Sequence, residues 1–293
     1  IMHDLWCATG ICHLPGSCER FESQCGCCPL LGHAGRKRHA HDLSWRVWQR
    51  KSRLYARHRR LQFVAVSRWQ HEVCLRSSLL RDRAIHVLPH AFPVEDYAVE
   101  PSADGLASLL GIGINLGRRL IVMAAARLDD PVKDLPMAVK ALNVLASSAP
   151  ELAAECQAVF VGELRDPSIL DTLKIDHVAT GLLDQSRLRD LYAAASAVIS
   201  TSDFETMGAT LMEGIASGAA AVTFGHGGQR DIVTHGINGY IARYKDPDDF
   251  AACLRKSLAA PFSRAGQHAS ISTRFSAPSI ALRFLNIVKA AHN

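Results

Sequence analysis

Short apolar runs alternate with amphipathic stretches along the chain from Arg119 onward. Such alternation predicts βαβ units, in which a parallel sheet is covered by helices on both faces. We therefore predict a doubly wound α/β domain over 120–260, followed by further helices. The expected strands are 120–126, 158–162, 177–181, 197–200 and 219–224, and the expected helices are 135–148, 185–195 and 208–217.

The earlier part of the chain has a weaker pattern. Residues 1–40 show little periodicity, and Pro93, Pro101 and several glycines favour a linker over 93–118. The domains predicted are therefore 1–92 and 93–293. Within the first, the expected elements are a helix at 43–60, strands at 63–66 and 85–88, and a helix at 68–77 between those strands.

The net charge of +5 is unevenly distributed. Residues 1–92 carry 15 Lys and Arg against 6 Asp and Glu, a balance of +9, and the rest of the chain carries 18 against 22, a balance of −4. A basic segment joined to a mildly acidic one favours two modules, of which the first faces an anionic partner. A set of basic helices that are simply solvated is the alternative.

Hydropathy bears on where the protein resides. Apolar residues make up 48% of the chain, enough for a sizeable core. No run of about 18 uncharged apolar residues is present, so a membrane-spanning helix is not expected. The first residues lack the basic and apolar regions of a secretion signal. We expect a cytoplasmic protein.

The loops that follow the expected strands carry the chemistry, because open α/β sheets bind ligands at the carboxyl ends of their strands. Arg127 and Lys133 lie in the loop after 120–126, just before a helix. Two cations beside a helix N-terminus suit a phosphate or diphosphate. A pair of solvated surface charges is the alternative.

The loop after 197–200 leads into a helix and holds two carboxylates eight residues apart, Glu205 and Glu213. Gly208 opens the helix between them, and Glu213 lies in a segment otherwise built of small and apolar residues. A carboxylate there is costly to bury unless hydroxyl or N–H groups meet it. The vicinal hydroxyls of a sugar or ribose are suitable partners, although Glu213 could also reach solvent.

Gly227 and Gly228 follow the expected strand 219–224 and precede a short helix. A glycine pair at this point permits close approach of the backbone to a ligand. For a glycine pair taken alone, ordinary turn formation is the better explanation.

Taken together, these motifs resemble the donor half of retaining glycosyltransferases of the GT-B fold and family-4 type, over about residues 85–293. The resemblance implies a complete carboxyl-terminal Rossmann-like domain preceded by a partial amino-terminal one. It implies that Arg127 and Lys133 hold the diphosphate of a nucleotide sugar, that Glu205 contacts the transferred sugar as a catalytic residue, and that Glu213 holds the ribose. The implied donor-binding set is completed by Phe204, Met207, Gly208, Gly227 and Gly228.

This chain departs from the family pattern at several positions. Met207 stands where an aromatic residue is usual, Ala220 where a proline is common, and Asp231 where a glutamate is common. Pro89-His90-Ala91 stands where the family usually has Pro-Asn-Gly. None of these departures removes a charged residue of the donor site.

The first residues are similar to a narrower group, the glycosyltransferases of colanic-acid and exopolysaccharide synthesis. The similarity rests on His3-Asp4-Leu5-Trp6, Thr9-Gly10 and the cysteines that follow. It implies that His3 is a catalytic histidine of the cleft, near the sugar and the leaving group. It also implies that roughly 100 residues of the amino-terminal domain are absent, so that residues 1–92 form a partial, acceptor-side domain.

Six of the nine cysteines lie within the first 28 residues. Cys12, Cys18, Cys25 and Cys28 offer four thiols with one C-x2-C knuckle, which makes a structural zinc site one hypothesis. Free thiols or a labile disulfide are the alternatives. Catalysis itself is expected to need no metal or other cofactor, because cationic side chains can neutralise the diphosphate.

The sequence therefore predicts a metal-independent, retaining hexosyltransferase that uses a nucleotide-diphosphate sugar and a polysaccharide or lipid-linked oligosaccharide acceptor. A remnant that binds nucleotide sugar with weak or no catalysis is one alternative. A zinc-dependent interaction module at 1–92 on an inert α/β domain is the other. Aromatic residues among the basic ones at 43–60 favour an anionic membrane surface, on the inner face of the membrane, over nucleic acid as the partner.

Overall fold

The computed structural model describes residues 1–13, 18–31, 39–97 and 99–292, with side chains placed up to residue 290. The chain forms two compact units. Unit 1 comprises residues 1–90 together with the end of the chain from residue 282, and unit 2 comprises residues 91–281.

The domain assignment of the end of the last helix thus differs from the prediction, in which all of 93–293 forms one domain. In the structure this segment belongs with unit 1, where the Arg283 guanidinium donates to the Val87 carbonyl over 3.4 Å.

Unit 2 is built on a parallel sheet with the strand order β5-β4-β3-β6-β7-β8. Strand order reverses between β3 and β6, which is the position at which open α/β sheets bind their ligands. The strands are β3 Arg119–Arg127, β4 Cys156–Glu163, β5 His177–Gly181, β6 Ala197–Ser200, β7 Ala220–Phe224 and β8 Gly239–Ala242.

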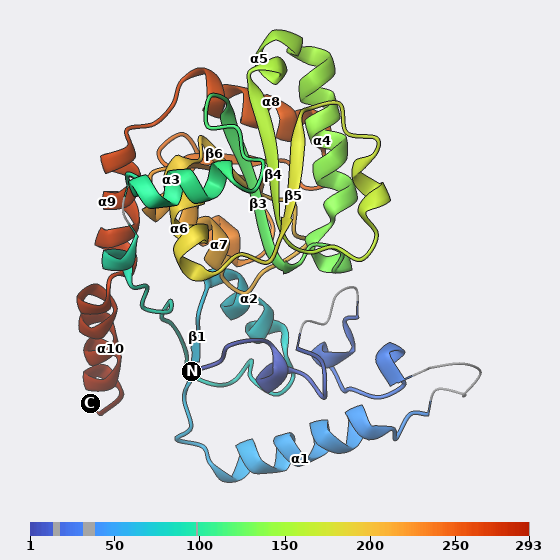
Figure 1. Cartoon of the computed structure of the whole chain (residues 1–293). Helices are drawn as coiled ribbons and strands as arrows, with labels where there is room; N and C mark the ends of the chain where they lie inside the picture. Colours follow the sequence, from blue (N-terminus) through green and yellow to red (C-terminus); the bar gives the residue numbers. More distant parts are fainter. Residues whose placement is uncertain (14–17, 32–38, 98, 293) are drawn as a thin grey trace. The chain divides into compact units, whose positions relative to one another are not determined.

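Helices cover both faces of this sheet, with α4 and α8 on one face and α3, α6 and α7 on the other (Figure 1). This layering confirms the predicted α/β fold class. The helices are α3 Ala103–Leu110, α4 Leu135–Ser148, α5 Pro150–Ala154, α6 Gln185–Ala194, α7 Ala209–Ala216, α8 Pro247–Ala259, α9 Arg264–Phe275 and α10 Ala277–His292. Short 3-10 helices occupy η4 Val94–Asp96, η5 Pro131–Lys133, η6 Pro167–Leu170 and η7 Gly228–Asp231.

The central strands of unit 2 are mostly apolar because both of their faces are buried. Val122, Val159 and Val222 on three different strands are completely inaccessible to solvent. Helix α7 approaches β6 closely at Gly214, where a Cβ atom would lie 2.3 Å from a Val198 methyl group. This contact fixes the position of the helix that carries Glu213.

In two segments of unit 2 the structure contains elements that were not predicted. Residues 93–118, expected to be a linker, contain η4 and α3, and the Ser102 hydroxyl caps α3 by accepting from the Gly105 amide. Strand β8 lies in a segment that reads as turn, with Gly239 paired to Ala221 on β7. These elements are short and depend on tertiary contacts, so local periodicity does not reveal them.

Unit 1 contains a parallel pair of strands, β1 Phe63–Ala65 and β2 Ile85–Val87, joined through α2 Arg68–Arg76. Met2 extends the pair by a parallel bridge to Ala65. The remaining elements are α1 Leu43–Arg57 and the 3-10 helices η1 Trp6–Ala8, η2 Arg20–Glu22 and η3 Pro29–Leu31.

Lys51 on α1 anchors the first residues of unit 1. Its buried ammonium donates to the carbonyls of Trp6, Thr9 and Gly10 over 2.5–3.0 Å. Three carbonyl acceptors compensate the desolvation of this charge, which explains how a lysine is accommodated in the core.

Candidate functional site

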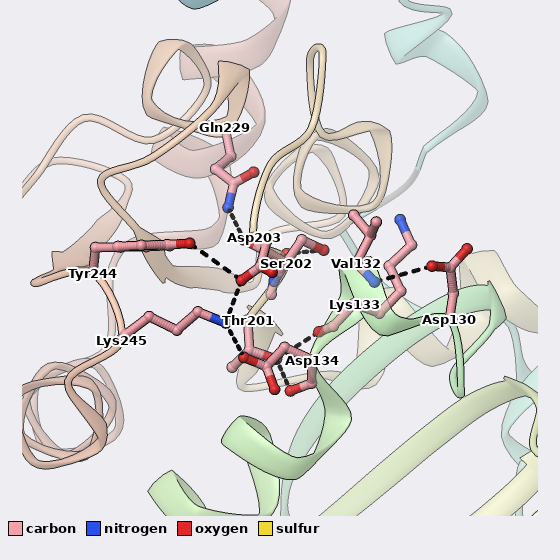
Figure 2. A network of polar contacts seen from close by, with 11 residues as sticks. Asp130, Val132, Lys133, Asp134, Thr201, Ser202, Asp203, Gln229, Tyr244 and Lys245 are labelled. Carbon is pink, nitrogen blue, oxygen red and sulfur yellow. Dashed lines mark hydrogen bonds and ion pairs between the residues drawn. The ribbon is translucent and has the colours of Figure 1, made fainter. Parts of the chain in front are cut away.

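The loops after β3 and β6 meet at the point where strand order reverses. The Asp203 amide donates to the Val132 carbonyl over 2.8 Å, and the Thr201 hydroxyl contacts the carbonyls of Lys133 and Asp134 at 2.9 and 3.0 Å (Figure 2). These bonds join two loops that are about seventy residues apart in sequence. Hydrogen bonds therefore connect the two loops at the carboxyl edge of the sheet.

Lys133 and Glu205 form an ion pair at this edge of the sheet. The Lys133 Nζ lies 2.5 Å from Glu205 Oε1, and both side chains are about one quarter exposed. The Ser202 hydroxyl donates to the same carboxylate oxygen over 3.0 Å. The structure thus brings together two residues that the sequence predicted for the donor site, in a position that solvent reaches.

Arg127 does not join this pair among the contacts of the described residues. It ends β3 and its guanidinium lies 3.4 Å from the Asp129 carboxylate, with 45% of the side chain exposed. An exposed arginine with one weak ion pair is available to an anion, and its predicted contact with a diphosphate stays a prediction.

Gly227 and Gly228 are required by packing within the protein. Gly227 has a φ of +77°, and a Cβ atom there would lie 2.8 Å from the Glu205 amide nitrogen. At Gly228 a Cβ atom would lie 2.0 Å from the Thr206 carbonyl oxygen, and its amide donates to the Glu205 carbonyl over 2.6 Å. The close approach allowed by this pair is thus to the loop that carries Glu205.

The start of α7 lies directly after Glu205. Gly208 precedes the helix in the left-handed conformation, with a φ of +97° that favours glycine. Met207 is buried and Phe204 is half-buried. The first turn of α7 places free amides and the positive end of the helix dipole beside the Glu205 loop, a suitable position for an anion.

Glu213 lies on α7, where it is half-buried next to two tyrosines. Burial raises the pKa of its carboxyl group, and the neighbouring hydroxyls of Tyr192 and Tyr97 oppose that shift. Burial also raises the pKa of Tyr97 to about 12, and the charge of Glu213 adds to the effect. The carboxylate therefore has two hydroxyl groups of the protein as neighbours, and its predicted contact with a ribose stays a prediction.

The sequence did not predict the three residues that neighbour Glu213, which are Tyr97, Arg189 and Tyr192. The Arg189 guanidinium lies 5.2 Å from the centre of the Tyr97 ring and 2.9 Å from the Asp96 carboxylate. Tyr192 is almost fully buried on α6. These residues come from a segment expected to be a linker and from the inner face of a helix, and neither pattern indicated a contact with Glu213.

His3 lies in unit 1, where its ring stacks on that of His90 with 5.0 Å between the ring centres. Burial, and then the neighbouring His3, lower the pKa of His90. Met2 is held by a parallel bridge to Ala65, the last residue of β1. The next residue, His3, therefore lies at the end of that strand. The catalytic role implied for His3 stays a prediction.

The cysteines of the predicted zinc site all lie in unit 1. Cys12, Cys25 and Cys28 are buried and Cys18 is half-buried. Burial raises the pKa of the Cys25 thiol to about 11, although the Gly10 amide donates to its sulfur over 3.1 Å. Among the residues that the structure describes, no three His, Cys, Asp or Glu side chains gather in a way that could hold a metal ion. The structural zinc site stays a prediction, and metal analysis of the purified protein is its test.

Within the described ranges, no helix has both the length and the hydropathy needed to cross a membrane.

Residues 119–260 match the family described as "Glycosyl transferases group 1". A curated relative, a D-inositol 3-phosphate glycosyltransferase of Nocardiopsis dassonvillei, is 28% identical over 202 residues. That alignment covers 63% of this chain and 44% of the relative. The residues matched by this family all lie within unit 2.

Solved structures share the fold. A glycosyltransferase from Rickettsia africae superposes with a TM-score of 0.68 at 16% identity, over 80% of this chain and 64% of that protein. Alr3699/HepE of Anabaena, solved in complex with UDP and glucose, gives a TM-score of 0.59 at 19% identity, over 77% and 62% of the two chains. The chain spans less than two thirds of each of these proteins. The comparisons establish a GT-B type architecture.

Proposed function

We propose that this chain, whose residues 119–260 match the group 1 glycosyltransferases, is a retaining hexosyltransferase that uses a nucleotide-diphosphate sugar. The observation that carries the proposal is the Lys133–Glu205 pair at the reversal point of the sheet, directly before α7. A cation, a carboxylate and a helix N-terminus at one sheet edge suit a sugar attached to a phosphate. The proposed acceptor is a polysaccharide or a lipid-linked oligosaccharide.

In the proposed mechanism, the ammonium of Lys133 leaves Glu205 and pairs with the diphosphate, while the first turn of α7 faces the same charge. Both groups stabilise the negative charge that develops as the bond between the sugar and the phosphate breaks. Glu205, released from Lys133, accepts hydrogen bonds from the sugar hydroxyls. Glu213 does the same for the ribose.

The acceptor hydroxyl then attacks the anomeric carbon from the face that the phosphate leaves. One C–O bond forms as the other breaks, and the acceptor proton passes to the departing phosphate. His3 is proposed to lie near the leaving group. We propose that the positive charges of Lys133 and Arg127 serve in place of a catalytic metal. The sequence Asp246-Pro247-Asp248 has the pattern Asp-x-Asp. Its first carboxylate, that of Asp246, caps α8 by accepting from the Asp249 amide over 2.9 Å.

Binding and turnover of several UDP- and GDP-sugars by the full chain test this proposal. We expect one donor to bind with a Kd in the micromolar range and to be hydrolysed or transferred, with binding lost in Lys133→Ala. Lys140→Ala, an exposed lysine on α4, is the matched control and should behave as wild type. Failure of every donor to bind would overturn the proposal. Binding of a donor without turnover, whichever acceptor is supplied, would favour the alternative of a remnant that binds nucleotide sugar without catalysis.

Helix α1 supports a cationic surface for the acceptor side. Its 15 residues include no Asp or Glu, and the side chains of Arg46, Arg50, Arg53 and Arg57 are exposed. Leu54 among them is 49% exposed. Exposed arginines flanked by an apolar side chain suit the interface of an anionic membrane, where each basic residue contributes about 1 kcal/mol. We propose a cytoplasmic protein that associates peripherally with the inner membrane face.

Sedimentation with lipid vesicles tests the membrane proposal. The protein should pellet with vesicles that contain phosphatidylglycerol and not with pure phosphatidylcholine. Arg50→Glu with Arg53→Glu should reduce binding by more than about tenfold, since both charges are reversed. Arg255→Glu, an exposed arginine on α8, is the matched control. Salt-dependent binding to DNA without vesicle binding would instead support a nucleic-acid partner for unit 1.

A further inference from the structure

The structure assigns Lys245 a positioning role: it ties together the two loops that hold Lys133 and Glu205. The inference deepens the proposed function and rests on it for its consequence, since these loops are the proposed donor site. No motif in the sequence indicated Lys245, which lies in the turn between β8 and α8.

The ammonium of Lys245 bridges two carboxylates from different loops (Figure 2). Its Nζ lies 2.5 Å from the Asp134 carboxylate and also contacts the Asp203 carboxylate. The neighbouring Tyr244 hydroxyl donates to Asp203 over 3.3 Å. Asp134 directly follows Lys133, and Asp203 lies two residues before Glu205, so the bridge holds each loop close to its functional residue.

The backbone at both ends of this bridge is in an unusual conformation. Lys245 has a φ of +60° and Asp134 a φ of +49°, both in the left-handed region that side chains rarely adopt. Non-glycine residues persist there when surrounding contacts hold them in place, and such positions concentrate at functional sites. Here the bridge itself is the contact common to both residues.

Electrostatics supports the same role. Partial burial lowers the pKa of the Lys245 ammonium, but its bonds to Asp134 and Asp203 raise the pKa by more, so the net shift is upward. Asp134 is 17% exposed and Asp203 30% exposed. Without the cation, two partly buried carboxylates would repel each other. The loops would then separate as far as the bonds made by Thr201 and the Asp203 amide permit.

Lys245→Gly separates this role from general stability. Glycine accepts a positive φ without strain, so the variant removes the bridge and leaves the turn unstrained. Lys245→Arg preserves the charge and can still reach both carboxylates. Arg243→Ala is the matched control, because Arg243 is a neighbouring cation, 75% exposed, whose ion pairs are with Asp246, which caps α8, and with Asp249 in its first turn.

Hydrogen exchange of the ligand-free full chain is the first measurement. Amides in 128–134 and 201–208 should exchange about tenfold faster in Lys245→Gly, while those of β4 stay unchanged and Lys245→Arg restores protection. Unchanged exchange in both loops would overturn the inference, whether or not the protein binds a donor.

Donor affinity is the second measurement. The Kd for the nucleotide sugar that wild type binds should rise about tenfold in Lys245→Gly, with little change in melting temperature, and should return to normal in Lys245→Arg. An unchanged Kd in Lys245→Gly would also overturn the positioning role. Failure of wild type to bind any donor contradicts the proposed function, and the exchange data still decide whether Lys245 ties the loops.

Discussion

Replacing Glu205 with glutamine is expected to lower the turnover of the nucleotide sugar by about 10²-fold or more. The amide retains the shape of the side chain and can still accept the bond from Ser202. It loses the charge that lies 2.5 Å from Lys133 and that is proposed to face the sugar. Steady-state kinetics on the donor identified by the binding screen measure the change.

The same variant should bind the free nucleotide diphosphate as tightly as wild type, or more tightly. Lys133 must leave Glu205 before it can pair with a phosphate, and the substitution removes that competing partner. A drop in turnover without a drop in affinity for the diphosphate distinguishes a role at the sugar from a collapse of the site. Glu163→Gln, an exposed carboxylate at the end of β4, is the control. Full activity in Glu205→Gln would contradict the assigned role.

Replacing Glu213 with glutamine is expected to weaken nucleotide binding by about tenfold and to stabilise the ligand-free protein. A charged acceptor makes stronger hydrogen bonds to hydroxyl groups than an amide does, so the affinity for the ribose should fall. The gain in stability follows from burial, which raises the pKa of this carboxyl group. Calorimetric titration with the nucleotide diphosphate and thermal melting measure the two effects.

The stability effect has a defined pH dependence. Because the folded pKa of Glu213 lies above the unfolded value, its protonated form stabilises the fold below the unfolded pKa, and this contribution is lost as pH rises through the folded pKa. Glu213→Gln should therefore melt roughly 1–2 °C above wild type at neutral pH, and the difference should vanish near about pH 4. Glu151→Gln, exposed on α5, should show neither effect. Equal melting temperatures at neutral pH together with unchanged affinity would contradict this account.

Sequence patterns predicted the sheet of unit 2 well because its strands and helices are locally distinct. The expected helix 135–148 and strand 177–181 have the bounds found for α4 and β5. Parallel strands bring their carboxyl ends to one edge of the sheet, and there Lys133 and Glu205, from two of the loops singled out in the sequence, lie in contact.

The contacts that sequence patterns missed are those made by residues distant in the chain. Nothing near Tyr97 or Tyr192 indicates that α7 will place Glu213 beside them. Lys245 lies in a turn whose sequence reads as ordinary surface, and its partners are 42 and 111 residues away. The Gly227-Gly228 pair illustrates the same limit. Its glycine requirement was recognised, but the neighbour that imposes it is a loop of the protein itself.

The assignment of the last residues to unit 1 has a consequence for the order of folding during synthesis. Unit 2 is continuous in sequence and is interposed within unit 1, which also includes the segment from residue 282. Since chains emerge from the ribosome amino-terminus first and domains fold as units, unit 2 is fully synthesised before this segment of unit 1 appears. Deleting the segment from residue 282 would therefore leave unit 2 intact in sequence and would alter unit 1.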